Sequence, residues 1–287
     1  MKKGITSDYT LLLREDLRFH FEGTNLILKN HSGDSVLLED IPFQILSELK
    51  YLLENPKIPV SKNNKLYPIL DFLHTNKMAA REPVSYEKWQ ARTAHWIANL
   101  DFDYDSVKVK LENSKVAILG LGGLGSVACQ QLAQSGVKKI ALIDYSRVNE
   151  EDLNRQLLYQ RSDIGLKKTT AAYNYLKENY SEISVDIIER KILGSEADLE
   201  LLKDINPNLL LFCADEPENL AKTVVELCID HPFSIIVSSV GLLDGYVSPV
   251  LSNRATKLDF LANYSDQAQP LKSSLSMTNA IVASWMA

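Results

Sequence analysis

The sequence predicts an α/β protein in which a mainly parallel sheet follows a small α+β domain. Three observations support this prediction. The chain has 287 residues, more than one domain usually holds, which favours two domains. From about residue 111 onward, short apolar strand patterns alternate with helical patterns, as in a parallel sheet covered by helices. A glycine-rich turn at 120–125 stands between the first of these strands and its helix.

Composition and charge exclude several classes of protein. Apolar residues make up 45% and charged residues 24% of the chain, which is ordinary for a globular protein with a buried core. The formal net charge of −6 gives no general attraction to nucleic acid or to an anionic membrane. The sequence begins with no signal peptide, and no apolar run approaches the roughly 20 residues of a membrane span. We therefore expect a cytoplasmic protein that binds neither nucleic acid nor a membrane.

The first domain is predicted to cover residues 1–82. Alternating patterns at 17–22, 25–29 and 35–38 predict an antiparallel meander, and helical periodicity follows at about 42–53 and 65–77. A unit of this kind resembles the winged-helix, PqqD-like domains that bind the leader of a precursor peptide. Such a domain can add the peptide as a strand to an exposed sheet edge. A purely structural role is the alternative.

A polar connector with several aromatic residues is predicted at 83–110, and a nucleotide-binding fold at 111–287. The expected strands of this fold are 116–119, 139–143, 185–188, 209–212 and 234–238, and the expected helices are 127–135, 166–179 and 218–228. An apolar helical pattern at 281–287 ends the sequence without a polar tail, so we expect the natural protein to continue.

The glycine-rich turn and a following acid predict a nucleotide site. Four glycines follow a strand and open a helix whose free amides can bind phosphate oxygens; they are Gly120, Gly122, Gly123 and Gly125. Asp144 ends the next strand, where its carboxylate can accept hydrogen bonds from ribose hydroxyls. These features alone fit an NAD-dependent oxidoreductase equally well.

Further motifs narrow this choice. The segment D-L-N-R-Q at 152–156 is followed by D-I-G-L-K-K at 163–168, and F-C-A-D at 212–215 ends a later strand. In this order and spacing, the motifs resemble the E1-like (ThiF/MoeB) adenylating superfamily over about residues 110–239. The resemblance implies an enzyme that uses ATP and Mg²⁺ to activate a carboxylate as an acyl-adenylate, with release of pyrophosphate.

The resemblance also implies roles for single residues. Arg155 and Lys168 match cations that contact the phosphates, and Asp215 matches the acid that handles Mg²⁺ and the triphosphate. Asp152 and Gln156 belong to the nucleotide contacts. Fixed cations suit this reaction because a carboxylate and a triphosphate, both anions, must meet. The alternative interpretation makes Arg155 and Lys168 surface charges and Asp215 a helix cap.

Asp152 departs from the family pattern, which usually has Asn at this position. An acid beside a triphosphate repels it unless a cation intervenes. We therefore expect either a different nucleotide contact here or an Asp152 that faces the substrate.

A connector residue, Arg92, matches the family arginine that reaches the ATP of a partner subunit, which implies a homodimer with composite sites. Its aromatic neighbours equally fit a packing helix.

The cysteines, Cys129, Cys213 and Cys228, form no C-x-x-C pair, so we expect no zinc site and interpret them as buried apolar residues.

The leader-binding domain and the adenylation motifs together resemble enzymes that mature ribosomal peptides, of the pantocin type and, second, of the microcin C7 type. The pantocin type implies activation of a glutamate side chain of a precursor peptide, followed by ring closure. One alternative is C-terminal adenylation of a peptide or a sulfur-carrier protein; another is an inactive, leader-binding scaffold.

The general base is not identified. His95 and the acids of segment 253–273 are the candidates. That segment has no cysteine, which argues against a thioester-forming enzyme.

Overall fold

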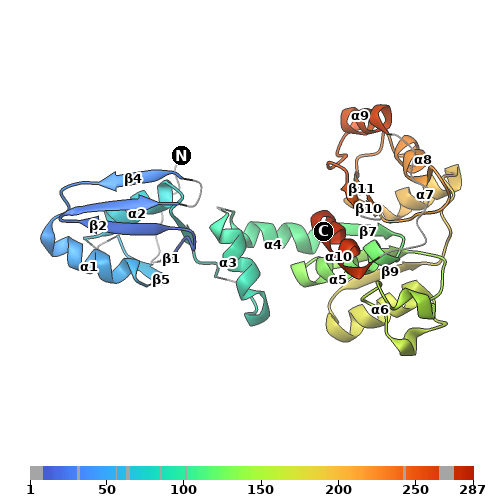
Figure 1. Cartoon of the computed structure of the whole chain (residues 1–287), viewed down its shortest axis with the longest axis horizontal. Helices are drawn as coiled ribbons and strands as arrows, with labels where there is room; N and C mark the ends of the chain where they lie inside the picture. The colour runs from blue at the N-terminus through green and yellow to red at the C-terminus, as the bar shows by residue number, and fades with distance from the viewer. Residues whose placement is uncertain are drawn as a thin grey trace. The chain divides into compact units, whose positions relative to one another are not determined.

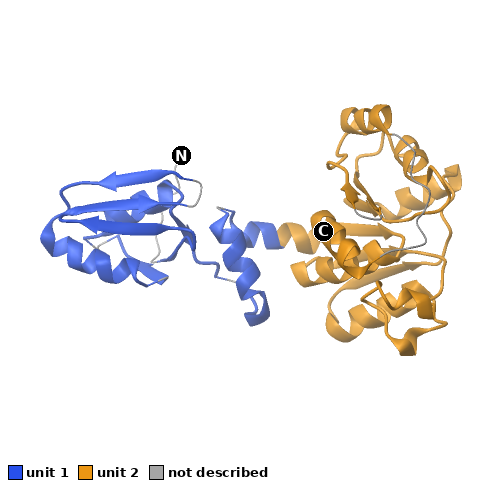
Figure 2. Cartoon of the chain, in the orientation of Figure 1, with its two compact units in different colours: residues 1–108 blue, residues 109–287 orange. Residues whose placement is uncertain are grey.

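The computed structural model describes residues 9–30, 33–55, 57–62, 65–84, 86–100, 102–241, 244–264 and 275–287. The chain divides into two compact units, residues 1–108 and 109–287 (Figure 2). The boundary between them falls within helix α4 (Tyr104–Asn113). None of the helices in the described ranges combines the length and the hydrophobicity that a membrane crossing requires.

In the described residues of the smaller unit, antiparallel sheets pack with helices (Figure 1). The predicted meander is present as β2 (Arg18–Glu22), β3 (Asn25–Lys29) and β4 (Ser35–Leu38), and the predicted helices as α1 (Phe43–Leu53) and α2 (Tyr67–Thr75). A second sheet, which the sequence patterns did not indicate, pairs β1 (Tyr9–Leu13) with β5 (Lys57–Val60) and β6 (Ala79–Arg81). Leucines from the strands and helices meet in one core, among them the fully buried Leu11, Leu26, Leu49 and Leu70. The winged-helix classification of this unit stays a prediction.

The connector is helical and has its own small aromatic core. A short 3₁₀ helix (Lys88–Gln90) leads into α3 (Ala91–Asn99). The ring of Tyr86 meets those of His95 and Tyr104 edge to face, at centroid distances of 5.7 and 6.3 Å. These contacts bring residues 86, 95 and 104 together.

The larger unit is built on a six-stranded sheet in the order β12-β11-β10-β7-β8-β9 within the described residues. Its strands are β7 (Lys115–Leu119), β8 (Lys139–Ile143), β9 (Ser184–Ile188), β10 (Leu209–Phe212), β11 (Ser234–Val240) and β12 (Gly245–Val247). All neighbouring pairs run parallel except β11 and β12. The predicted mainly parallel sheet is confirmed.

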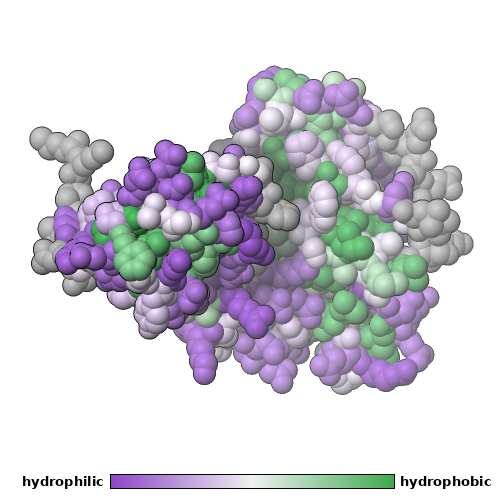
Figure 3. Space-filling view, turned by 60° about the vertical axis from the view of Figure 1, so that its left-hand side comes forward, coloured by the Kyte–Doolittle hydropathy of each residue, from purple (hydrophilic) through white to green (hydrophobic). Residues whose placement is uncertain are grey.

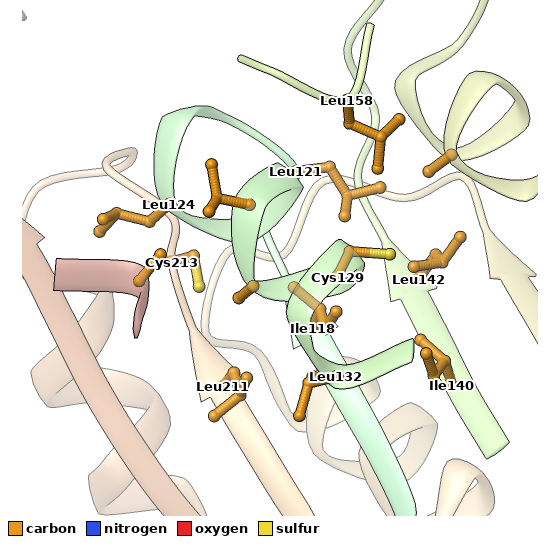
Figure 4. Packing of buried hydrophobic residues seen from close by; sticks show 14 of the residues in the cluster. Ile118, Leu121, Leu124, Cys129, Leu132, Ile140, Leu142, Leu158, Leu211 and Cys213 are labelled. Atoms are coloured by element: carbon orange, nitrogen blue, oxygen red, sulfur yellow. The ribbon is translucent and has the colours of Figure 1, made fainter. Parts of the chain in front are cut away.

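Helices cover both faces of this sheet (Figure 1). One face packs against α5 (Gly123–Ser135), α6 (Lys168–Asn179) and α10 (Ser276–Met286), and the other against α7 (Glu196–Ile205), α8 (Leu220–Leu227) and α9 (Arg254–Asn263). Alternation along the strands explains the two cores. In β7, Ile118 points to the α5 side with Leu132 and Leu211 (Figure 4), whereas Leu119 packs on the other side.

The outer surface is mixed in character. Figure 3 shows hydrophilic and hydrophobic residues interspersed over the face in view.

The strand order is the feature that positions a site. From β7 the chain moves to β8 and β9 on one side, and then returns to place β10 and β11 on the other. Open α/β sheets bind ligands at the carboxyl ends of the strands beside such a reversal, here between β7 and β10.

Candidate functional site

The glycine turn after β7 requires glycine for steric reasons. Gly120 has φ = +92°, a conformation that L side chains rarely adopt. A Cβ on Gly120 would lie 2.8 Å from the Cys213 carbonyl oxygen, because the turn crosses the end of β10 at close range. A Cβ on Gly125 would overlap the Gly120 carbonyl oxygen, so α5 packs directly on the turn. Both glycines are needed to bring β7, β10 and α5 together.

Gly122 differs from these two because it faces open space. No atom lies within 4 Å of the position where its Cβ would stand. It is the N-cap residue of α5, so the free amides of the first helical turn lie beside that space. The arrangement is suited to a phosphate group, since both the open position and the helix dipole favour an anion there.

Asp144 holds the glycine turn in place. Its Oδ2 accepts a hydrogen bond from the Leu121 amide at 2.7 Å, and its Oδ1 accepts one from the Ser146 amide at 2.7 Å. The Leu121 carbonyl in turn accepts the buried Tyr159 hydroxyl at 2.8 Å. Each carboxylate oxygen can accept more than one hydrogen bond, so a ribose contact stays a prediction for Asp144.

Asp152 ends a short 3₁₀ helix (Glu150–Asp152), and Arg155 and Gln156 follow within four residues of it. Asp152 is only 5% exposed, and its Oδ1 accepts a hydrogen bond from Gln156 Nε2 at 2.6 Å. An Arg155 guanidinium nitrogen lies 4.0 Å from the same oxygen. Arg155 also donates to the Glu151 carbonyl at 3.0 Å, which orients its side chain.

Lys168 begins α6 and is buried, with 8% of its surface exposed. Its Nζ lies 3.4 Å from Asp152 Oδ2, and its backbone amide donates to the Ser146 carbonyl at 3.0 Å. The two predicted cations therefore share one carboxylate. Asp152 faces two cations of its own chain, and both expectations for its contact with nucleotide or substrate stay predictions.

Asp215 follows β10 and opens to the same space. Its pKa is raised because the surrounding protein displaces water from the carboxylate. Arg155 and Lys168 oppose this shift through their positive charges, while Glu216 adds to it. The two cations and this acid thus act on one another electrostatically.

One cavity of about 860 Å³ joins these groups. Its wall includes Gly122, Gly123, Asp152, Arg155, Gln156, Lys168 and Asp215, and also residues of α9, α10 and β12. A smaller cavity of about 270 Å³ shares Gly122, Lys168 and Asp215 with it and adds Gly120, Asp144, Tyr145 and Lys191. All the predicted site residues of the larger unit except Gly125 therefore line two adjoining cavities at the reversal of strand order.

Two of the sequence-based candidates belong to the smaller unit. Arg92 lies in α3, and its predicted reach into a partner subunit stays a prediction. The Nε2 atom of His95 lies 3.3 Å from the hydroxyl oxygen of Tyr86. In the larger unit, Asp259 of α9 lines the large cavity, whereas residues 265–273 of the candidate segment lie outside the described residues.

Sequence patterns did not indicate several residues that shape these cavities. Asn279 of α10 contacts Gly123, where a Cβ would overlap its side-chain oxygen. Asn279 is 4% exposed. The sequence does not distinguish it from the other polar residues of α10, which are Ser276, Thr278 and Ser284. In the smaller cavity, Lys191 Nζ lies 4.9 Å from the ring centre of Tyr145. No spacing in the sequence connects these two residues.

The thiols are buried, in agreement with their interpretation as apolar residues. Burial raises the pKa of Cys129 and Cys213 to about 12 and that of Cys228 to about 11. Thiolates are the reactive form, so these cysteines are not suited to form a thioester. No group of three or more His, Cys, Asp or Glu residues that could hold a metal ion occurs in the described part of the chain.

Known sequences relate this chain to adenylyltransferases. The adenylyltransferase and sulfurtransferase uba4 of Aspergillus niger is 39% identical over 110 residues, which are 38% of this chain and 22% of that protein. The molybdopterin-synthase adenylyltransferase of Haemophilus influenzae is 34% identical over 154 residues, which are 53% of this chain and 60% of that protein. The chain thus spans about a fifth of the first relative and three fifths of the second.

Known structures share the fold over nearly the whole chain. Escherichia coli MccB, solved with ATP, superposes with a TM-score of 0.70 at 20% identity, over 96% of this chain and 86% of that chain. PaaA superposes with a TM-score of 0.68 at 19% identity, over 94% and 87%. MccB is described as a microcin C7 biosynthetic enzyme and has also been solved with N-formylated MccA.

Residues 98–287 match the model of the ThiF family. The match covers most of the chain, including the glycine turn, the two cations and Asp215. It agrees with the resemblance that the motifs at 152–156, 163–168 and 212–215 carry. The chain belongs to the ThiF family.

Proposed function

We propose that the chain uses ATP to activate a carboxylate of a ribosomally made precursor peptide as an acyl-adenylate, with release of pyrophosphate. One observation carries this proposal: Arg155, Lys168 and Asp215 line a single cavity beside the open glycine turn. Two fixed cations and an acid beside free helix amides suit a triphosphate, whereas a dinucleotide would not require them. The adenylyltransferases among its relatives support the same chemistry.

The two cavities suggest how the nucleotide lies. We place the adenosine in the smaller cavity, where Asp144 would accept hydrogen bonds from the ribose and Tyr145 offers an aromatic face. The phosphates then lie where the cavities join, at Gly122 and Lys168. The rest of the large cavity, lined by α9 and β12, is left for the peptide carboxylate.

In the proposed step, a carboxylate oxygen attacks the α-phosphorus of ATP. The bond from that phosphorus to the oxygen bridging to the β-phosphate breaks, and pyrophosphate leaves with the electron pair. Arg155 offers a planar fork of donors and Lys168 a point charge, so both stabilise the charge that builds up on the phosphate oxygens. The adenylate leaves a carbonyl carbon that a nucleophile can attack.

Mg²⁺ fits this site through Asp215. In ATP sites, Mg²⁺ is commonly held by one or two carboxylates together with the phosphates, and needs no cage of protein ligands. Asp215 reaches the cavity beside both cations and would be the protein ligand. When bound, the ion supplies positive charge to the triphosphate.

The smaller unit is proposed to bind the leader of the peptide. Its sheets end in β2 and β4, and in β5 and β6, so each offers edges to an added strand. The shared fold with MccB, which has been solved with the peptide MccA, supports a peptide substrate. We further propose a glutamate side chain as the activated group, followed by ring closure, and a homodimer in which Arg92 reaches the partner's ATP.

The test uses purified protein, candidate precursor peptide and ATP with Mg²⁺. AMP and pyrophosphate are expected, and the product peptide should lose water or carbon dioxide by mass analysis. Arg155→Ala and Lys168→Ala should each lower turnover about 100-fold or more while leader binding is unchanged. Arg161→Ala, an exposed cation paired with Glu150, is the control that retains activity.

Several outcomes would contradict the proposal. ADP in place of AMP would rule out adenylation. Leader binding without any nucleotide turnover would favour the inactive scaffold. A nucleotide retained on the peptide would support adenylation but contradict ring closure.

A further inference from the structure

Asp152 is a buried acid inside a cavity that we assign to an anion. Only 5% of its surface is exposed. Both carboxylate oxygens are engaged: Oδ2 accepts the Asn149 amide at 2.9 Å and lies 3.4 Å from Lys168 Nζ, and Oδ1 accepts Gln156 Nε2 at 2.6 Å. These hydrogen bonds and the nearby cation offset the cost of burying this carboxylate. Two of its partners, Lys168 and Gln156, line the cavity.

Lys168 depends on Asp152 because of where it lies. It is the first residue of α6, and a positive charge at a helix N-terminus opposes the helix dipole. It is also 8% exposed, so water does little to stabilise the ammonium group. The salt bridge with Asp152 offsets both effects. Asp152 is the ion-pair partner of Lys168 among the described residues, so we expect the lysine side chain to be held less firmly without it.

Asp152 also sets the orientation of the Gln156 amide. A carboxylate oxygen only accepts hydrogen bonds, so the amide nitrogen of Gln156 must face it. Gln156 is 2% exposed, and its Oε1 has no hydrogen-bond partner among the described residues. An Asn at position 152 would allow either orientation of this amide. The acid therefore fixes two side chains that line the cavity.

We propose that Asp152 is a positioning residue for the adenylation step, which holds Lys168 and Gln156 in place until the triphosphate takes over Lys168. This inference rests on the proposed function. ATP and Asp152 then compete for the same ammonium group. The acid weakens ATP binding through its charge, and it raises the rate of the chemical step because Lys168 is already in place.

The variant Asp152→Asn separates these two effects. It keeps the size of the side chain and removes its charge. The dissociation constant of a non-hydrolysable ATP analogue, measured by calorimetry, should fall about tenfold because one negative charge is lost beside the phosphates. The kcat for pyrophosphate formation should fall about tenfold or more because Lys168 is no longer held. A purely structural role would instead predict weaker binding of the analogue together with a lower kcat.

Asp163 provides a matched control. Its Oδ2 accepts the Gln160 amide at 2.8 Å, and it ends the short 3₁₀ helix Arg161–Asp163 in the way that Asp152 ends its own. Among the described residues, Asp163 forms no ion pair. Asp163→Asn should therefore leave both the dissociation constant and kcat within about twofold of wild type. Equal effects of the two variants would overturn the proposal.

Asp152→Glu is the second variant, and it tests the positioning role of Asp152 if Asp152→Asn fails to fold. It keeps the charge but moves the carboxylate by one methylene group. The affinity for the ATP analogue should stay near that of wild type, while kcat should fall. Unchanged kcat in both variants, or weaker analogue binding by Asp152→Asn, would overturn the proposal. Wild-type release of AMP and pyrophosphate is measured in parallel, so failure of the proposed function would be seen separately.

Discussion

At the scale of single residues, the site is a balance of charges around Asp215. The protein around this acid raises its pKa, although the proposed step needs it ionised. Activity should therefore be lost at a higher pH than for an ordinary aspartate, as the pH falls through the raised pKa. Glu216 contributes to this shift through its negative charge, and it also lies 3.7 Å from Lys191.

Glu216→Gln should move the acidic limb of the pH profile to lower pH. The substitution removes a negative charge that disfavours the ionised form of Asp215, so the pKa of Asp215 falls. The measurement is kcat/KM for pyrophosphate release as a function of pH. Glu200→Gln, on the outer surface of α7, should leave the limb in place. A limb that stays fixed in Glu216→Gln would show that another group controls it.

Much of the site could be predicted because its residues follow neighbouring strands. Residues after β7, β8 and β10 meet at one edge of a parallel sheet. The convergence of the motifs with Arg155, Lys168 and Asp215 can therefore be predicted without knowing where their side chains lie. The partners of Asp152 could not be predicted, since they depend on rotamers inside the cavity. Asn279 could not either, because the packing of α10 on α5 is a long-range contact.

At the scale of elements, strands and helices with strong local patterns were predicted within a few residues. The expected strand 209–212 is β10, and the expected helix 42–53 is α1. The second sheet of the smaller unit was missed, since β1 has no partner near it in the chain and pairs with β5 and β6. Helix α7 was missed although Ser195, its N-cap, accepts the Asp198 amide and carries a capping signature.

Two glycines of the turn allow a matched prediction at this scale. Gly125→Ala should lower the free energy of unfolding by about 2 kcal/mol, since the new methyl group overlaps the Gly120 carbonyl. Gly122→Ala should lower it by less than about 1 kcal/mol, because its Cβ would meet no atom within 4 Å. Gly122→Ala should instead weaken binding of the ATP analogue. Denaturant unfolding and calorimetry measure the two effects, and equal destabilisation would contradict the prediction.

At the scale of the whole molecule, the question is whether one active site needs two chains. Arg92 lies in the smaller unit, and Arg155 lines the cavity of the larger one. If Arg92 acts on the partner's ATP, then a dimer of one Arg92→Ala chain and one Arg155→Ala chain has one site with both defects and one intact site. If Arg92 acts within its own chain, each site has one defect.

Mixing the two inactive variants therefore distinguishes these arrangements. After subunit exchange, half of the dimers are mixed and each has one intact site, so about a quarter of the wild-type activity should return. Pyrophosphate release before and after mixing is the measurement. Each variant mixed with itself is the control and should stay inactive. No recovery in mixtures that have exchanged subunits would place Arg92 in its own chain's site or outside any site.

The deep burial of all three thiols has a practical consequence for studies of motion. Alkylating reagents and mild oxidants react with thiolates, which these side chains scarcely form near neutral pH. A maleimide dye should therefore attach only to a cysteine introduced at the surface. The native background needs no replacement before fluorescence is used to follow the distance between the two units during turnover.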